Sequence, residues 1–101
     1  MICKRTFTKT CVARTISWNT DDYVGKIYHI IVKPATSSTT YNFTMTGDNS
    51  VALYEENGKM GTFKDNTQNG VDGIYTCLIA NSSKTDEVFT IEIFYEEIPS
   101  A

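Results

Sequence analysis

The sequence predicts an all-β fold, a single antiparallel β-sandwich of the jelly-roll kind with about seven or eight strands. Segments rich in β-branched and aromatic residues recur roughly every ten residues, with turn-forming residues between them. No stretch shows a helical period of useful length. The clearest alternation lies in 88–96, which places four apolar residues on one face of a strand: Phe89, Ile91, Ile93 and Tyr95.

Length and composition are those of one folded domain, 1–101. A chain of 101 residues can remove roughly two thirds of its unfolded surface from water. Its 41% hydrophobic and 21% charged residues lie far from the composition of disordered chains. The net charge is -3 and the nine basic residues are spread along the chain, so we expect no nucleic-acid partner. We find no signal peptide or membrane span, and expect synthesis in the cytoplasm and no membrane partner.

Three segments make up the N-terminal half. Residues 4–16 are rich in Thr and alternate loosely, which predicts one long or two short strands at a sheet edge. Residues 17–25 combine turn formers with Trp18 and Tyr23, and predict the first substantial loop. Residues 26–33 are apolar on both faces, which predicts a central strand covered on both sides.

The C-terminal half continues the alternation of strands and turns. Further strands are expected at 40–46, 51–55, 60–63 and 73–81, before the final strand at 88–96. An Asn57-Gly58 pair is typical of a tight hairpin, and would join 51–55 to 60–63. We expect a turn at 47–49 and a polar loop at 65–73.

The three cysteines are expected to be reduced. Cys3, Cys11 and Cys77 are odd in number and show no metal-ligand spacing. If 3–11 is one strand, eight residues at about 3.3 Å each separate its two cysteines, well beyond the roughly 7 Å Cα limit of a disulfide. Cys77 lies in an apolar strand, where we expect a small buried hydrophobe.

No residue pattern indicates an enzyme. His29 is the single histidine and shares its predicted strand with Ile27 and Ile31, on the same face. A catalytic histidine needs a serine and a carboxylate converging on it, and no nucleophile motif such as GxSxG is present. We therefore expect His29 to be packed or at an interface, with no catalytic residues.

The segment 65–73 is the most metal-like part of the chain, because it is dense in oxygen ligands. Against the EF-hand pattern it keeps Asp65 and Asn69, but Thr67 and Thr76 stand where ligands belong. An ordinary polar turn is the favoured interpretation, with a loose calcium site as the alternative. We expect no metal and no cofactor.

Trp18 and Tyr23 suggest a second kind of binding. They flank Asn19, Asp21 and Asp22 in the predicted loop, and aromatic rings beside carboxylates and amides often hold sugars. A carbohydrate-binding module is therefore the alternative function. The competing interpretation is that Trp18 closes one end of the sandwich, since burial of its large apolar surface is strongly stabilising.

The layout of the second half resembles a known architecture. The order of runs, covering about residues 40–95, is similar to that of small jelly-roll sandwiches such as bacterial pre-peptidase C-terminal domains: 41–46, 51–54, 73–81 and 89–93. The resemblance implies the sandwich fold and assigns no functional residue.

A second resemblance supplies the functional expectation. The phrases 4–10, 28–36 and 73–76 look like those of short structural proteins encoded by tailed bacteriophages. This likeness implies a non-enzymatic virion component, a capsid decoration or cement protein or a tail accessory. Such a protein would bind a coat or tail protein, and also further copies of itself, and would be located in the virion.

Two candidate contact elements follow from this expectation. The Thr-rich strand 4–10 can add to a neighbouring sheet edge by main-chain pairing, although an internal edge strand is the simpler interpretation. The predicted loop supplies the second element. The candidate partner-binding residues are Lys4, Thr6, Thr8, Thr10, Trp18 and Tyr23.

Overall fold

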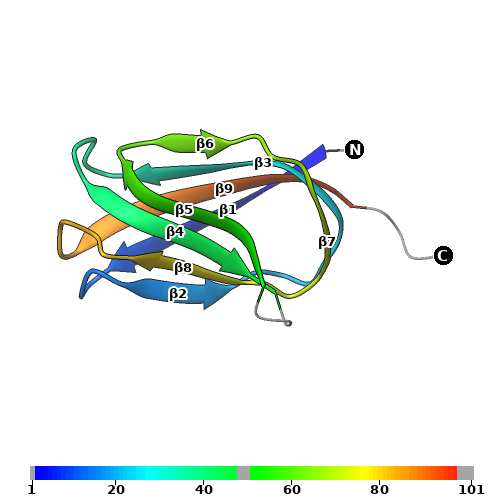
Figure 1. Cartoon of the computed structure of the whole chain (residues 1–101), viewed down its shortest axis with the longest axis horizontal. Coiled ribbons are helices and arrows are strands. Elements are labelled where there is room, and N and C mark those ends of the chain that lie inside the picture. The colour runs from blue at the N-terminus through cyan, green and yellow to red at the C-terminus, as the bar shows by residue number, and fades with distance from the viewer. Residues whose placement is uncertain (1, 48–50, 98–101) are drawn as a thin grey trace.

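The computed structural model describes residues 2–47 and 51–97, which form two antiparallel sheets packed face to face (Figure 1). The described residues contain nine strands: β1 (Ile2–Cys11), β2 (Ile16–Asn19), β3 (Tyr23–Pro34), β4 (Thr40–Thr46), β5 (Ala52–Met60), β6 (Phe63–Asp65), β7 (Asn69–Gly73), β8 (Thr76–Ala80) and β9 (Glu87–Glu97). The predicted β-sandwich is confirmed. It has more strands than the seven or eight expected, because β2 and β7 form in two segments that were predicted to be loops.

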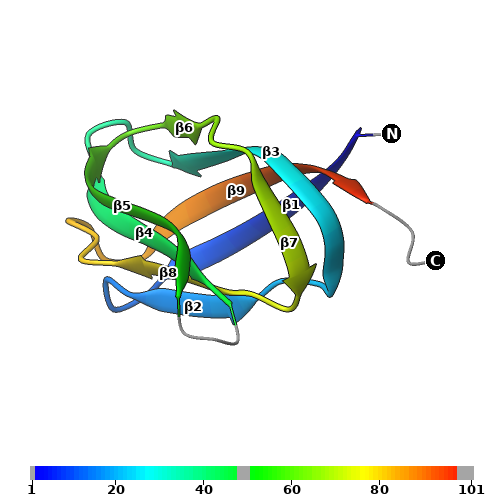
Figure 2. The ribbon, with the colours of Figure 1, turned by 45° about the vertical axis from the view of Figure 1, so that its right-hand side comes forward.

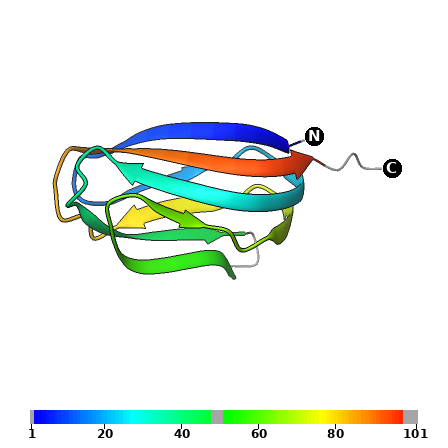
Figure 3. The ribbon, with the colours of Figure 1, turned by 90° about the horizontal axis from the view of Figure 1, so that it is seen from above.

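The strands divide between the two sheets by position rather than by chain order. Sheet A has the order β1-β9-β3-β6, and β7 also pairs with β3; sheet B has the order β2-β8-β4-β5. Figure 3 shows the two layers from the side, with β1, β9 and β3 in one and β4 and β5 in the other. In Figure 2, β6 and β7 follow one another along β3. Strand β1 is therefore an edge strand, as predicted for the N-terminal segment.

The core lies between the sheets and is formed by alternate residues of their strands. In β9 the four residues predicted to share a face are all buried. They pack in one cluster with the inward residues of sheet B, among them Tyr41, Phe43, Met45, Cys77 and Ile79. Burial of each large apolar side chain contributes roughly 1.5–3 kcal/mol. Burial also raises the pKa of the Cys77 thiol to about 12, so this cysteine is the small buried hydrophobe that was expected.

A bulge in β3 changes the faces that were predicted for this strand. The register with β9 shifts between Ile27 and His29, so that Tyr28 is an extra residue. Ile27 and Ile30 are both buried as a result, whereas His29 and Ile31 lie on the outer face. The prediction that His29 shares a face with Ile27 is wrong. The central position of β3 in its sheet is confirmed, but the predicted cover on both faces is wrong, because among the described strands sheet B packs against one face only and Lys33 on the other face is exposed.

The loop predicted at 17–25 is largely absent. Strand β2 covers Ile16–Asn19 and β3 begins at Tyr23, so a short connection separates the two strands. Trp18 lies opposite Cys77 in the β2–β8 ladder and faces the core. Burial of this large ring outweighs the turn-forming tendency of its polar neighbours.

The Asn57-Gly58 hairpin prediction is also wrong. Strand β5 continues through this pair and forms a bulge against β4, where Gly58 has φ +64° and donates its N–H to Asn42 Oδ1 at 2.8 Å. The left-handed conformation that favours glycine in a turn is used here within a strand. The chain turns later, at Gly61, whose N–H donates to the Thr39 carbonyl at 3.0 Å.

The segment 65–73 is not the polar loop that was expected. Residue 65 ends β6 and 69–73 form β7, and both strands pair with β3. The Gly-rich and Asn-rich sequence has low strand propensity, so main-chain pairing with a well-packed neighbour decides its conformation. The turn expected at 47–49 falls largely outside the described residues.

A buried carboxylate fixes the connection between β3 and β4. Glu87 is 4% exposed and accepts hydrogen bonds from the Thr36 N–H, at 3.2 Å, and from the hydroxyl groups of Thr36 and Thr39. Burial raises the pKa of the Glu87 carboxyl, but these hydrogen bonds and the nearby Lys84 outweigh it and hold the pKa below its ordinary value. The start of β9 is thereby tied to the segment where the chain passes from sheet A to sheet B.

The Glu87→Gln variant is expected to lose about 1–3 kcal/mol of stability at pH 7, because an amide cannot accept all these hydrogen bonds. Since the folded pKa of Glu87 is lowered, its contribution is complete above the ordinary value and is lost as the pH falls through the folded pKa. Urea unfolding at pH 7 and at about pH 3 measures both effects. The exposed Glu97→Gln is the control, and equal losses in the two variants would contradict this role.

Two glycines with similar φ angles are expected to differ in tolerance. A Cβ at Gly61 would lie 2.6 Å from the Ser37 carbonyl oxygen, whereas one at Gly58 would meet nothing within 4 Å. Gly58→Ala should therefore cost only the left-handed strain, about 1–2 kcal/mol. Gly61→Ala adds a clash with main chain and should cost roughly 2–4 kcal/mol. Chemical unfolding of both variants compares them, and equal losses would contradict the close approach at Gly61.

Candidate functional site

An exposed row of side chains runs along edge strand β1. Lys4, Thr6, Thr8 and Thr10 alternate with inward residues and are exposed on the outer face of sheet A. Among the described strands, β1 pairs with β9 alone, along its full length from Ile2 to Cys11. Four of the six predicted contact residues therefore share one exposed row.

The charge of this row is balanced by the neighbouring strand. Lys4 Nζ lies 3.2 Å from Glu92 Oε2, and Lys33 Nζ lies 3.6 Å from Glu92 Oε1. The hydrogen bond from Lys4 and the proximity of Lys33 hold the pKa of the Glu92 carboxyl below its ordinary value, against the effect of burial. One carboxylate of β9 thus bridges lysines of β1 and β3, and sets the position of Lys4.

The inward side of β1 carries residues that the sequence analysis did not single out. The Arg5 guanidinium lies 5.8 Å from the Tyr95 ring centroid, with Nε 3.1 Å from Asp21 Oδ2, and Lys9 Nζ lies 5.9 Å from the Trp18 ring centroid. Inward-pointing charges are a common device against indiscriminate pairing at a sheet edge. Strict alternation along 4–10 would have placed Arg5 and Lys9 on this side, opposite the threonines.

Trp18 and Tyr23 are not at the surface, which corrects their assignment as contact residues. Trp18 is 8% exposed and Tyr23 is 2% exposed, and both belong to the core cluster. Tyr23 packs against Tyr95 with ring centroids 4.7 Å apart, and Trp18 packs against Phe7 at 6.1 Å. The glycan hypothesis requires two exposed rings side by side, and the structure provides no such pair at these residues. Trp18 instead fills the sandwich interior.

Both of these aromatic residues have a polar atom that lacks a hydrogen-bond partner within the described part of the chain. These atoms are Trp18 Nε1 and the Tyr23 hydroxyl, and both are buried. Burial, followed by the nearby Asp21, raises the pKa of Tyr23 well above its ordinary value. An unsatisfied buried polar group typically costs about 1–3 kcal/mol. In both residues, burial of the ring stabilises the fold, whereas burial of the unpaired polar atom destabilises it.

His29 has aromatic rather than catalytic surroundings. Its ring centroid lies 4.4 Å from that of Phe94, on the outer face of sheet A. Partial burial, followed by the positive charge of Lys64, lowers the pKa of His29. A neighbouring cation opposes the protonated form that a carboxylate partner would favour. His29 therefore lacks the electrostatic setting of a catalytic triad.

Two oxygen atoms of the segment considered for calcium accept hydrogen bonds from other groups of the protein. Asp65 Oδ1 accepts the Thr67 N–H at 2.8 Å, and the Thr67 carbonyl accepts the Tyr54 hydroxyl at 2.8 Å. Across residues 2–47 and 51–97, no three His, Cys, Asp or Glu side chains are grouped so as to hold a metal ion. The same residues contain no helix long and apolar enough to cross a membrane.

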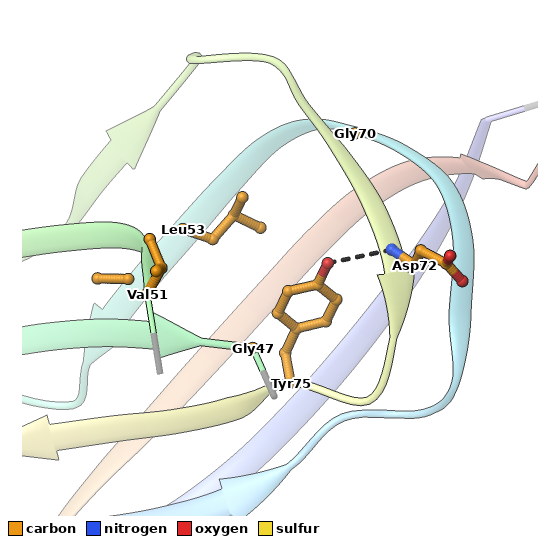
Figure 4. Close-up of a pocket in the computed structure, with 7 residues that line it drawn as sticks. Gly47, Val51, Leu53, Gly70, Asp72 and Tyr75 are labelled. Atoms are coloured by element: carbon orange, nitrogen blue, oxygen red, sulfur yellow. Dashed lines mark hydrogen bonds between the residues drawn. The ribbon is translucent and has the colours of Figure 1, made fainter. Parts of the chain in front are cut away.

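A pocket of about 400 Å³ lies where the ends of β4 and β5 approach β7 (Figure 4). Its lining consists of Gly47, Val51, Ala52, Leu53, Gly70, Asp72 and Tyr75. The Asp72 N–H donates to the Tyr75 hydroxyl oxygen at 3.0 Å, which fixes the tyrosine ring in the wall. One carboxylate and one phenol among small and aliphatic residues form no acid–base pair of the kind that hydrolytic chemistry uses.

Comparisons with known proteins support the fold. No family model matches the sequence, and no curated protein sequence matches it. Among solved structures, the chain is similar to PliG of Aeromonas hydrophila, a periplasmic inhibitor of g-type lysozyme. The identity is 14%, the TM-score is 0.50, and the match covers 94% of this chain and 86% of PliG. At this identity the likeness shows a shared β-sandwich fold and nothing about activity.

Two further matches are weaker. One is a structure of infectious bursal disease virus strain Gx, at 11% identity and TM-score 0.32, covering 97% of this chain and 37% of the other. The second is dimeric latent PorU of Porphyromonas gingivalis, at 15% identity and TM-score 0.34, covering 93% of this chain and 10% of PorU. These scores are too low to support any inference about function.

Two buried tyrosine hydroxyl groups test whether an unpaired hydroxyl lowers the stability of the fold. Tyr23→Phe removes an unpaired hydroxyl and is expected to leave stability unchanged or to raise it by up to about 1–2 kcal/mol. Tyr41→Phe should cost about 1–2 kcal/mol, since its hydroxyl donates to the Gly61 carbonyl at 2.6 Å. Urea unfolding of the two variants compares them. A loss in Tyr23→Phe as large as in Tyr41→Phe would show that the Tyr23 hydroxyl has a partner.

Proposed function

We propose that this chain is a non-enzymatic binding module, a bacteriophage virion component that attaches to a coat or tail protein through edge strand β1. The observation behind the proposal is the long edge of β1, which pairs on one side only among the described strands and has an exposed row of threonines beside it. Such an edge is suited to accept a partner strand by main-chain hydrogen bonding.

The side chains of β1 favour some partner strands over others. The strand carries Lys4, Arg5 and Lys9 and no carboxylate. A partner strand with acidic or neutral residues would be accepted, whereas one with basic residues opposite these positions would be disfavoured. The inward Arg5 and Lys9 also discourage unselective pairing. Main-chain bonds would thus supply affinity, and these charges would supply selectivity.

The surroundings of the ionisable residues are consistent with a non-enzymatic role. His29 lies against Phe94 and near Lys64, and the carboxylates Glu87 and Glu92 are engaged in structural hydrogen bonds and ion pairs. The proposal therefore needs no chemistry from these groups.

A second candidate comes from the likeness to PliG, which covers nearly the whole of both chains. PliG is described as an inhibitor of g-type lysozyme, and inhibition also requires only a binding surface. Assay of a purified g-type lysozyme with and without this chain separates the two candidates. Potent inhibition would favour the inhibitor function, and full lysozyme activity is the result expected for the virion component.

Attachment through β1 is expected to depend on the main-chain donors that face outward. In an antiparallel ladder, successive residues direct their N–H groups to opposite edges. Of Thr8→Pro and Lys9→Pro, one therefore removes a bond to β9 and the other removes only an outward donor. The variant that keeps its thermal stability is the one that lacks an outward donor. It should no longer co-sediment with tailed phage particles, prepared from the host that carries the gene.

Glu97→Gln lies at the end of β9 and serves as the control, since it leaves the β1 edge intact. The wild-type chain and this control should co-sediment with the particles. Attachment that survives in both proline variants would contradict strand addition at β1. Absence of the wild-type chain from purified particles would contradict the virion role itself.

A further inference from the structure

The outer face of sheet B is almost free of charge. Burial alternates along β2, β8 and β4, so their outward residues follow directly. These residues are Ser17, Asn19, Thr40, Asn42, Thr44, Thr46, Thr76, Leu78 and Ala80, and none of them is ionisable. Edge strand β5 adds Met60 opposite Thr40, Ala52 opposite Thr46 and a single carboxylate, Glu55, opposite Thr44.

The other sheet of the same molecule has a different outer face. Six charged side chains project from the outward side of β1, β9, β3 and β6 in sheet A: Lys4, Lys26, Lys33, Lys64, Glu92 and Glu96. Both faces belong to one small domain, so overall composition cannot explain the contrast. Depletion of charged residues is the compositional mark of the core of a protein interface.

We propose that the outer face of sheet B packs against the same face of a second copy, to form a symmetric dimer. Leu78 lies near the centre, on strand β8, with Ser17 on one side and Thr44 on the other. Met60 is 66% exposed at the edge of the face and is available to a partner. A two-fold axis near Leu78 would bring the uncharged centres of the two copies together.

The absence of charge favours a second copy over a charged partner. A symmetric interface places each residue near its own counterpart, so a charged centre would repel itself whereas this one does not. The polar groups are also partly satisfied within the chain. Thr76 donates its hydroxyl to Asn19 Oδ1 at 3.0 Å, and Asn42 Oδ1 accepts the Gly58 N–H at 2.8 Å. Their burial would therefore cost less than that of free polar groups.

The size of the molecule allows such a dimer. The principal extents are 45 × 25 × 19 Å, so the broad side has room for the roughly 800 Å² per partner of a standard interface. Figure 3 shows that sheet B lies on the opposite side of the sandwich from β1 and β9. Dimer formation and attachment through β1 can therefore occur together, and the dimer does not depend on the proposed function.

The native mass in solution tests this proposal on the free protein. The wild-type chain is expected to give twice the 11.3 kDa chain mass in light scattering. Leu78→Glu should raise the dissociation constant roughly 100-fold or more, because like charges then meet at the axis. Thr90→Glu is the matched control on sheet A, where the partner positions Thr8 and Lys33 accommodate a carboxylate, and its mass should stay that of the wild type.

A charge swap separates an interface role from damage to the fold. Mixing Leu78→Glu with Leu78→Lys should restore a dimer, since the opposite charges then face each other, and thermal melting confirms that each variant is folded. If the wild-type chain stays monomeric up to roughly 0.5 mM, its dissociation constant is higher than that of any stable interface, and the proposal is overturned. So would a dimer unaffected by Leu78→Glu. Failure to bind phage particles would leave this result untouched, so the two proposals are tested separately.

Discussion

Strand β9 is the element on which the rest of the structure depends. It pairs with β1 on one side and β3 on the other, and its inward residues lie in the same cluster as those of sheet B. Phe89 contacts Tyr41 across the core, with ring centroids 5.0 Å apart. The same strand holds Glu87 at its start and Glu92 on its outer face. Burial of one face of β9 therefore fixes which side of sheet A meets solvent.

This constraint gives the molecule two surfaces of different chemistry. Sheet A faces outward with lysines bridged by Glu92, and ends at an edge strand with a threonine row. Sheet B faces outward with hydroxyl, amide and small apolar groups, centred on Leu78. An edge suited to strand addition and an uncharged face suited to self-packing can serve different partners. The proposed attachment uses the first of these surfaces, and the proposed dimer uses the second.

The sequence was most informative where alternation and burial agree, and least where main-chain geometry decides. The inward set of β9, the central position of β3 and the edge position of β1 were predictable from period-two patterns. The bulge at Tyr28 was not, because one extra residue leaves no composition signal. Asn57-Gly58 has the composition of a turn but lies in a bulge. For the site, the exposed row was predictable, whereas Trp18 and its polar neighbours resembled a loop because strand propensity depends on the packing partner.

Amide hydrogen exchange along β1 is the measurement to make, because it reports which side of this strand is free to pair with another strand. If β1 pairs with β9 alone, alternate amides from Cys3 to Thr10 should exchange slowly and the intervening ones quickly, while both parities in β9 stay protected. Uniform protection along β1 would show that its outer edge is already covered. Uniformly fast exchange would show that the β1–β9 ladder does not hold in solution. Either result would contradict a β1 that pairs with β9 and leaves its other edge free.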